Sequence, residues 1–154
     1  MVTLMAKLKL YLDTSVFSAY YDNRAKMRQE QTKEFWTKLT DYEKYASDLV
    51  VDELNAVTDE KLRDNLIKLT YDIIILKVDD ESDNLAKKYI ERGIFPERYR
   101  DDAIHLAIAT VNGIDILVSW YFEHLVKRKT RLEANLANSL NGYKSIDIIA
   151  PPEL

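Results

Sequence analysis

Three acidic residues, Asp13, Glu53 and Asp102, stand at positions from which a fold can gather them into one site. Asp13 directly follows an apolar segment at residues 8–12, and the other two fall in segments with helical patterns. Carboxylates held close together repel one another unless a cation neutralises them. Mg²⁺ and Mn²⁺ are hard cations that prefer oxygen ligands. The three positions together therefore indicate a site for a divalent cation.

Each of these residues also has an ordinary structural explanation. Asp13 precedes Thr14 and Ser15 and can cap a helix N-terminus. Glu53 can be a solvated helix residue, and Asp102 can stabilise the positive end of its helix dipole. Asp101 points about 100° away from Asp102 on a helix, so the two are not expected to reach one ion. The joint pattern, rather than any single residue, favours the cation site.

The chain must position these residues with alternating strands and helices. Apolar or β-branched segments at 8–12, 44–46, 73–76, 115–119 and 145–149 predict strands, and helical patterns fill the intervals between them. This order predicts an α/β fold with a mainly parallel central sheet covered by helices on both faces, in three layers, as a single domain over residues 1–154. Sites in such folds lie beyond the carboxyl ends of strands, where Asp13 and Ser119 fall.

Composition narrows the chemistry. The 154 residues contain no cysteine, which excludes disulfides, thiol catalysis and zinc–thiolate sites. No apolar run is long enough for a membrane span, and Lys7 and Lys9 interrupt the N-terminal apolar segment, so we expect a soluble, cytoplasmic protein. The net charge of −4 argues against a surface that coats nucleic acid indiscriminately, but it is compatible with an enzyme that holds cations.

Several segments resemble the PIN domain family, in the expected order along essentially the whole chain. Residues 10–17 (LYLDTSVF) look like its opening motif, and residues 102–109 (DAIHLAIA) are similar to its third acidic motif. Residues 117–125 resemble its fourth motif, and residues 142–151 its final strand. Glu53, in residues 47–54, matches the second acidic position less specifically, and Asp52 is the competing residue.

The resemblance implies a three-layer α/β/α domain that cleaves RNA with Mg²⁺ or Mn²⁺. Asp13, Glu53 and Asp102 would hold the cation, which activates a water molecule and stabilises charge on the attacked phosphate. Many family members are VapC-like toxins of type II toxin–antitoxin pairs, so the resemblance also implies RNA as substrate and a small antitoxin protein as partner. PIN-like domains often pair, and we accordingly expect a homodimer and no membrane association.

The sequence departs from the family pattern in the fourth motif. Family members commonly carry Asp or Asn two residues after the Thr or Ser of that motif, where this chain has Tyr121. A phenol titrates near pH 10 and is a poor ligand for a hard cation. Ser119 retains a hydroxyl that can orient a water molecule. The departure leaves open whether one or two cations bind.

Other residues have two interpretations each. His105 can act as a general base or as a hydrogen-bonded packing residue, and His124 has the same alternatives with less support. The basic segments 24–28 and 127–131 can hold phosphates or form solvated helix faces. Tyr20, Tyr21 and Trp120 are candidates for stacking on unpaired bases.

Three function hypotheses follow. The leading one is a metal-dependent endoribonuclease, the toxin of a toxin–antitoxin pair. The second is a weakened or inactive PIN-like domain that binds RNA or protein as a regulatory module, with Tyr121 marking loss of the site. The third is a different phosphoryl-transfer enzyme on a parallel sheet, although the lack of a glycine-rich phosphate loop argues against nucleotide hydrolysis.

Overall fold

A parallel sheet forms the centre of the molecule. The computed structural model describes residues 6–154. Its five strands lie in the order β3-β2-β1-β4-β5, and every neighbouring pair is parallel. The strands are β1 (Lys9–Leu12), β2 (Glu43–Ser47), β3 (Ile74–Leu76), β4 (Ile116–Val118) and β5 (Asp147–Ile149).

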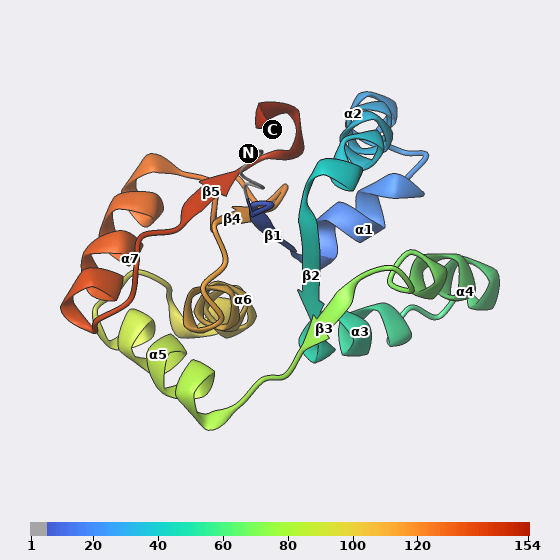
Figure 1. Cartoon of the computed structure of the whole chain (residues 1–154). Helices are drawn as coiled ribbons and strands as arrows, with labels where there is room; N and C mark the ends of the chain where they lie inside the picture. Colours follow the sequence, from blue (N-terminus) through green and yellow to red (C-terminus); the bar gives the residue numbers. More distant parts are fainter. Residues whose placement is uncertain (1–5) are drawn as a thin grey trace, which may run out of the picture.

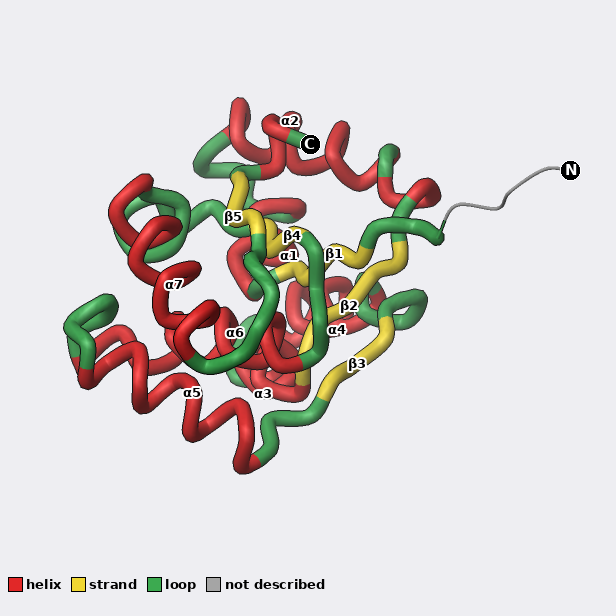
Figure 2. The backbone as a smooth tube through the Cα atoms, turned by 60° about the vertical axis from the view of Figure 1, so that its left-hand side comes forward, coloured by secondary structure: helices red, strands yellow, loops and turns green. Residues whose placement is uncertain are grey.

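Helices cover both faces of this sheet, which confirms the predicted α/β class and its three layers. Figure 1 shows one group of helices on each side of the sheet. The first group is α1 (Thr14–Tyr20), α2 (Lys26–Thr37), α3 (Asp48–Asn55) and α4 (Glu60–Lys68). The second group is α5 (Asp80–Glu91), α6 (Arg100–Val111) and α7 (Arg128–Leu140). Short 3₁₀ turns span Leu39–Asp41, Glu97–Tyr99 and Pro151–Glu153, and the last of these contacts α2 (Figure 2).

The most buried elements are β1 and α6. Leu10, Tyr11 and Leu12 are fully buried, as expected for a central parallel strand that is covered on both faces. Most of α6 is also inaccessible to solvent, which follows from the near-continuous apolar sequence between residues 103 and 109. Asp102 and His105 lie on this helix and are carried with it into the interior.

The connections between strands lead to opposite sides of β1. The chain passes from β1 to β2 on one side, whereas β4 pairs with β1 on the other side. The register places Leu12 opposite Val118, and the Asp13 amide donates a hydrogen bond of 3.2 Å to the Val118 carbonyl. Asp13 and Ser119 therefore lie next to each other at the topological switch point, the usual place for a site in an open α/β sheet.

The structure adds two local features that the sequence pattern does not specify. The segment 73–76 carries the strongest β-branched pattern, yet β3 is an edge strand with Ile74 53% exposed and Ile75 38% exposed. Local pattern reports strand preference but not the place of a strand within its sheet. The 3₁₀ turn Glu97–Tyr99 leads directly into α6, which begins at Arg100, so Asp102 lies in the first turn of this helix. Of the helices in the described part of the chain, none has the length and apolar character needed to cross a bilayer.

Candidate functional site

Asp13 is a fully buried carboxylate at the end of β1. It caps α1, and its Oδ1 accepts hydrogen bonds from the Ser15 amide (3.0 Å) and the Ser15 hydroxyl (2.5 Å). Its Oδ2 is buried and has no hydrogen-bond partner within residues 6–154. Burial raises the pKa of Asp13 to about 6, although His105, Ser119 and Ser15 act in the opposite direction. Asp13 therefore does cap the helix, but only Oδ1 of its carboxylate has hydrogen-bond partners.

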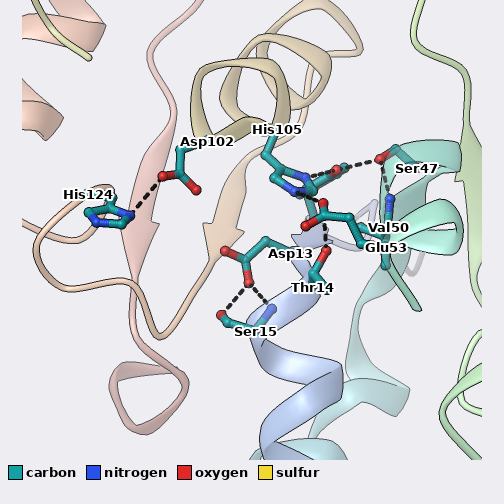
Figure 3. A network of polar contacts seen from close by, with 10 residues as sticks. Asp13, Thr14, Ser15, Ser47, Val50, Glu53, Asp102, His105 and His124 are labelled. Carbon is teal, nitrogen blue, oxygen red and sulfur yellow. Dashed lines mark hydrogen bonds and ion pairs between the residues drawn. The ribbon is translucent and has the colours of Figure 1, made fainter. Parts of the chain in front are cut away.

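A chain of hydrogen bonds fixes Glu53. Its Oε1 accepts from the Thr14 hydroxyl (3.1 Å) and from His105 Nε2 (2.9 Å). His105 Nδ1 lies 2.7 Å from the Tyr11 hydroxyl, which in turn lies 2.7 Å from the hydroxyl of Ser47, the N-cap of α3. Figure 3 shows this network converging on Glu53 beside Asp13. Glu53 is therefore held in place by residues from β1, α1 and α6, while Asp52 is exposed.

The network sets the charges of Glu53 and His105. Burial opposes ionisation of Glu53, but the hydrogen bond and charge of His105, together with the Thr14 hydroxyl, outweigh burial and lower the pKa of the carboxyl. Burial also opposes protonation of His105, yet its bond to Glu53 and the charges of Asp13 and Asp102 raise the pKa of the imidazole. Both ring nitrogens of His105 are engaged and the residue is 1% exposed, so the structure supports the hydrogen-bonded packing role.

Asp102 has a histidine partner of its own. Its Oδ2 lies 2.8 Å from His124 Nδ1, and the His124 ring stacks on Tyr99 with 3.7 Å between the ring centroids. Burial raises the pKa of Asp102, although both histidines oppose this shift. Asp101 is exposed on the same helix, which agrees with Asp102 being the inward-facing acid.

Residues that follow β4 lie next to Asp13. Ser119 is fully buried, and its Oγ accepts a hydrogen bond of 3.0 Å from the Tyr121 amide. The Ser119 hydroxyl helps to lower the pKa of Asp13, although it does not reach ordinary hydrogen-bond geometry to Oδ2. Burial, together with the charges of Asp13, Glu53 and Asp102, raises the pKa of Tyr121, so its phenol stays neutral at physiological pH.

The donor set suits a hard cation, but the side chains are not arranged as a ready-made coordination shell. Glu53 Oε2, Asp102 Oδ1 and Asp13 Oδ2 take no hydrogen bond in the described part of the chain, so each carboxylate keeps one oxygen available. Among residues 6–154, no three His, Asp or Glu side chains stand in an arrangement that could hold a metal ion. Cation binding by all three acids therefore requires one or more of these side chains to move, with the free oxygens of Glu53 and Asp102 and the Asp13 Oδ2 as the available ligands.

The sequence correctly predicted Asp13 at the end of a strand and Glu53 and Asp102 on helices, but it did not reveal their hydrogen-bond partners. Nothing in the pattern of a buried strand distinguishes Tyr11 as a hydrogen-bonding residue, and the His124–Tyr99 stack joins the loop after β4 to the 3₁₀ turn before α6. Thr14 and Ser15 could be recognised from the sequence, because hydroxyl residues that follow an acidic residue at the end of a strand are typical of a helix N-terminus. Of the aromatic residues proposed to stack on bases, Trp120 is only 6% exposed and Tyr20 packs edge-on against Tyr21.

Comparison with known proteins identifies the family. The PIN domain profile matches residues 10–120, and this chain therefore belongs to the PIN domain family. A comparison with curated proteins finds no match.

Solved structures share the fold at low sequence identity. FitAcB from Neisseria gonorrhoeae superposes with a TM-score of 0.61 at 16% identity, covering 94% of this chain and 99% of that chain. DNA-bound VapBC from Salmonella typhimurium gives 0.60 at 14% identity, covering 94% and 98%. Mycobacterium tuberculosis VapC20, described as a sarcin–ricin loop cleaving toxin, gives 0.58 at 20% identity, covering 71% and 87%.

Proposed function

We propose that this chain is an endoribonuclease that hydrolyses RNA phosphodiester bonds with Mg²⁺ or Mn²⁺. Asp13, Glu53 and Asp102 bind the cation in this proposal, and Ser119 orients a water molecule through its hydroxyl. The observation that carries the proposal is Asp13: it is fully buried, its Oδ2 has no hydrogen-bond partner within residues 6–154, and the negative charge of Asp102 acts on it. Membership of the PIN domain family supports the same chemistry.

The residues around the acids have defined parts in this mechanism. A bound cation supplies positive charge to the attacked phosphate and makes a water molecule more acidic. Thr14 and His105 hold Glu53 so that one of its oxygens stays available, and His124 does the same for Asp102. Ser15 ties Asp13 to the Trp120 amide through its own hydroxyl, at 2.8 Å, and so fixes the acid against β4.

The biological setting is proposed from the structural neighbours. Several of them are toxin–antitoxin complexes, which supports a role as the toxin of a type II pair with a small antitoxin as partner. We also propose that the chain acts as one domain in the cytoplasm and forms a homodimer. An exposed apolar row on α7 is compatible with self-association; it comprises Leu132, Leu136 and Leu140.

A second candidate is a PIN-like domain without nuclease activity that binds RNA or protein. Two observations favour it. Tyr121 replaces a fourth acid beside the cluster, and the described side chains do not form a coordination shell as they stand. In this case the histidine contacts to Glu53 and Asp102 would be permanent structural bonds rather than supports for cation ligands.

Matched pairs of variants separate the two candidates. RNA cleavage by the full chain is measured with Mn²⁺ and with chelator, for Asp102→Asn against Asp101→Asn and for Glu53→Gln against Asp52→Asn. The nuclease proposal expects cleavage that chelator abolishes, loss of cleavage in Asp102→Asn and Glu53→Gln, and retention in both controls, whose side chains are exposed. RNA binding without any cleavage by the unmodified chain would instead support the second candidate.

A further inference from the structure

A hollow of about 300 Å³ lies beside the carboxylate cluster. It is lined by Arg28, Trp120, Tyr121, Phe122, Glu123 and His124. A second hollow, of about 620 Å³, shares the walls formed by Arg28, Trp120 and Phe122 and adds Lys26. Volumes in this range are typical of small-molecule pockets. The two hollows together form a groove between the start of α2 and the loop after β4.

Two walls of the first hollow belong to the candidate active site. His124 lines the hollow and is bonded to Asp102 at 2.8 Å. Tyr121 also lines it, and its phenol is influenced by the charges of Asp13, Glu53 and Asp102. A ligand in the hollow is therefore in immediate contact with residues that adjoin the carboxylates.

The chemistry of the walls suits a planar, partly polar ligand. Phe122 is 47% exposed and Tyr121 36% exposed, so parts of their rings are open to contact. The Arg28 guanidinium covers the buried Trp120 ring, 4.9 Å from its centroid, and forms no ion pair within residues 6–154. Unpaired nucleobases stack on aromatic rings and on guanidinium planes. Glu123 adds an acceptor that can pair with an N–H group on the edge of a base.

We propose that this hollow binds one unpaired nucleobase of single-stranded RNA next to the bond that is cut. Phe122 and Tyr121 contact the face of the base, and Arg28 contacts the base or the neighbouring phosphate. The inference rests on the proposed ribonuclease function and adds the part of the substrate that is recognised. An apolar protein side chain fits less well, because it would bury the Arg28 and Glu123 charges without partners.

The experiment measures affinity for short, fluorescently labelled, single-stranded oligoribonucleotides, with chelator present so that no cleavage occurs. Phe122→Ala should weaken binding about tenfold, within the range for loss of one base–aromatic contact. Phe122→Trp should retain the affinity, and Tyr71→Ala, at an exposed aromatic position outside the hollow, should leave it unchanged. An oligomer with abasic sugars should bind wild type and Phe122→Ala equally weakly. Thermal melting confirms that each variant is folded.

Equal RNA affinity of Phe122→Ala and wild type would overturn the proposal, as would an equal loss with the abasic oligomer. Absence of RNA binding by wild type would overturn it as well. A failed cleavage assay has a different meaning: if Phe122-dependent binding persists while Mn²⁺ produces no cleavage, the nuclease function fails and the base-binding hollow stands.

Discussion

The buried charge of Asp13 makes a quantitative prediction about stability. Folding raises the pKa of this carboxyl from 3.8 to about 6, mainly through burial. The folded protein therefore binds a proton more tightly than the unfolded chain, and stability is lost as pH rises from about 4 to about 6. The destabilisation is about 1 kcal/mol at pH 4.5 and about 3 kcal/mol at pH 7.5, because each pKa unit corresponds to about 1.4 kcal/mol.

Asp13→Asn removes this penalty at nearly constant shape. The asparagine Oδ1 can still accept both hydrogen bonds from Ser15 and cap α1. Its new Nδ2 group is buried, and an unsatisfied N–H costs about 1–3 kcal/mol. That cost does not depend on pH. The stability of the variant relative to wild type should therefore improve by about 2 kcal/mol between pH 4.5 and pH 7.5, whatever its absolute value.

The assay is urea unfolding of both proteins across this pH range, with chelator present throughout. The informative quantity is the change with pH in the difference between the two free energies of unfolding. Ser15→Ala provides a control that weakens the cap while leaving the carboxyl in place. Parallel pH profiles for wild type and Asp13→Asn would show that folding does not raise the pKa of Asp13, as would a variant that becomes relatively less stable as pH rises.

Three further predictions concern the surrounding network. Tyr11→Phe removes the hydroxyl between Ser47 and His105 and should lower the free energy of unfolding in urea by about 1–3 kcal/mol. An unchanged free energy of unfolding would show that these two hydrogen bonds do not stabilise the fold. Tyr121→Asp adds a fourth carboxylate, so it should lower the melting temperature in chelator and tighten Mn²⁺ binding about tenfold, measured by calorimetry. Ser119→Ala should reduce the cleavage rate with little effect on Mn²⁺ affinity, and an unchanged rate would remove Ser119 from the mechanism.

The sequence predicted those parts of the fold that local patterns determine. The strand at residues 8–12 ends where its apolar run meets Asp13, and Asn112-Gly113 and Asn141-Gly142 follow the last helical residues of α6 and α7. At Gly113 the backbone has a φ of 68°, a conformation that a residue with a side chain rarely adopts. Capping and helix-ending chemistry depend on a few neighbouring residues, so a single sequence reveals them.

The interactions within the site depend on distances between elements, which no local pattern contains. Glu53 could be preferred over Asp52 because Val50 and Leu54 mark the buried side of α3. Its bond to His105, by contrast, requires α3 and α6 to approach across β1. The same limit applies to Phe122, which gave no signal in the sequence and lines the hollow only because the loop after β4 lies beside α2.

Mn²⁺ affinity, measured calorimetrically on the full chain, tests most directly whether Asp13, Glu53 and Asp102 share a cation. We predict that wild type binds Mn²⁺ and that Asp13→Asn, Glu53→Gln and Asp102→Asn each weaken binding at least about tenfold, since each removes a ligand charge. Asp101→Asn, an exposed neighbour, should bind as wild type does. Wild type that binds no Mn²⁺, or an affinity unchanged by any of the three substitutions, would show that the three carboxylates do not share a cation.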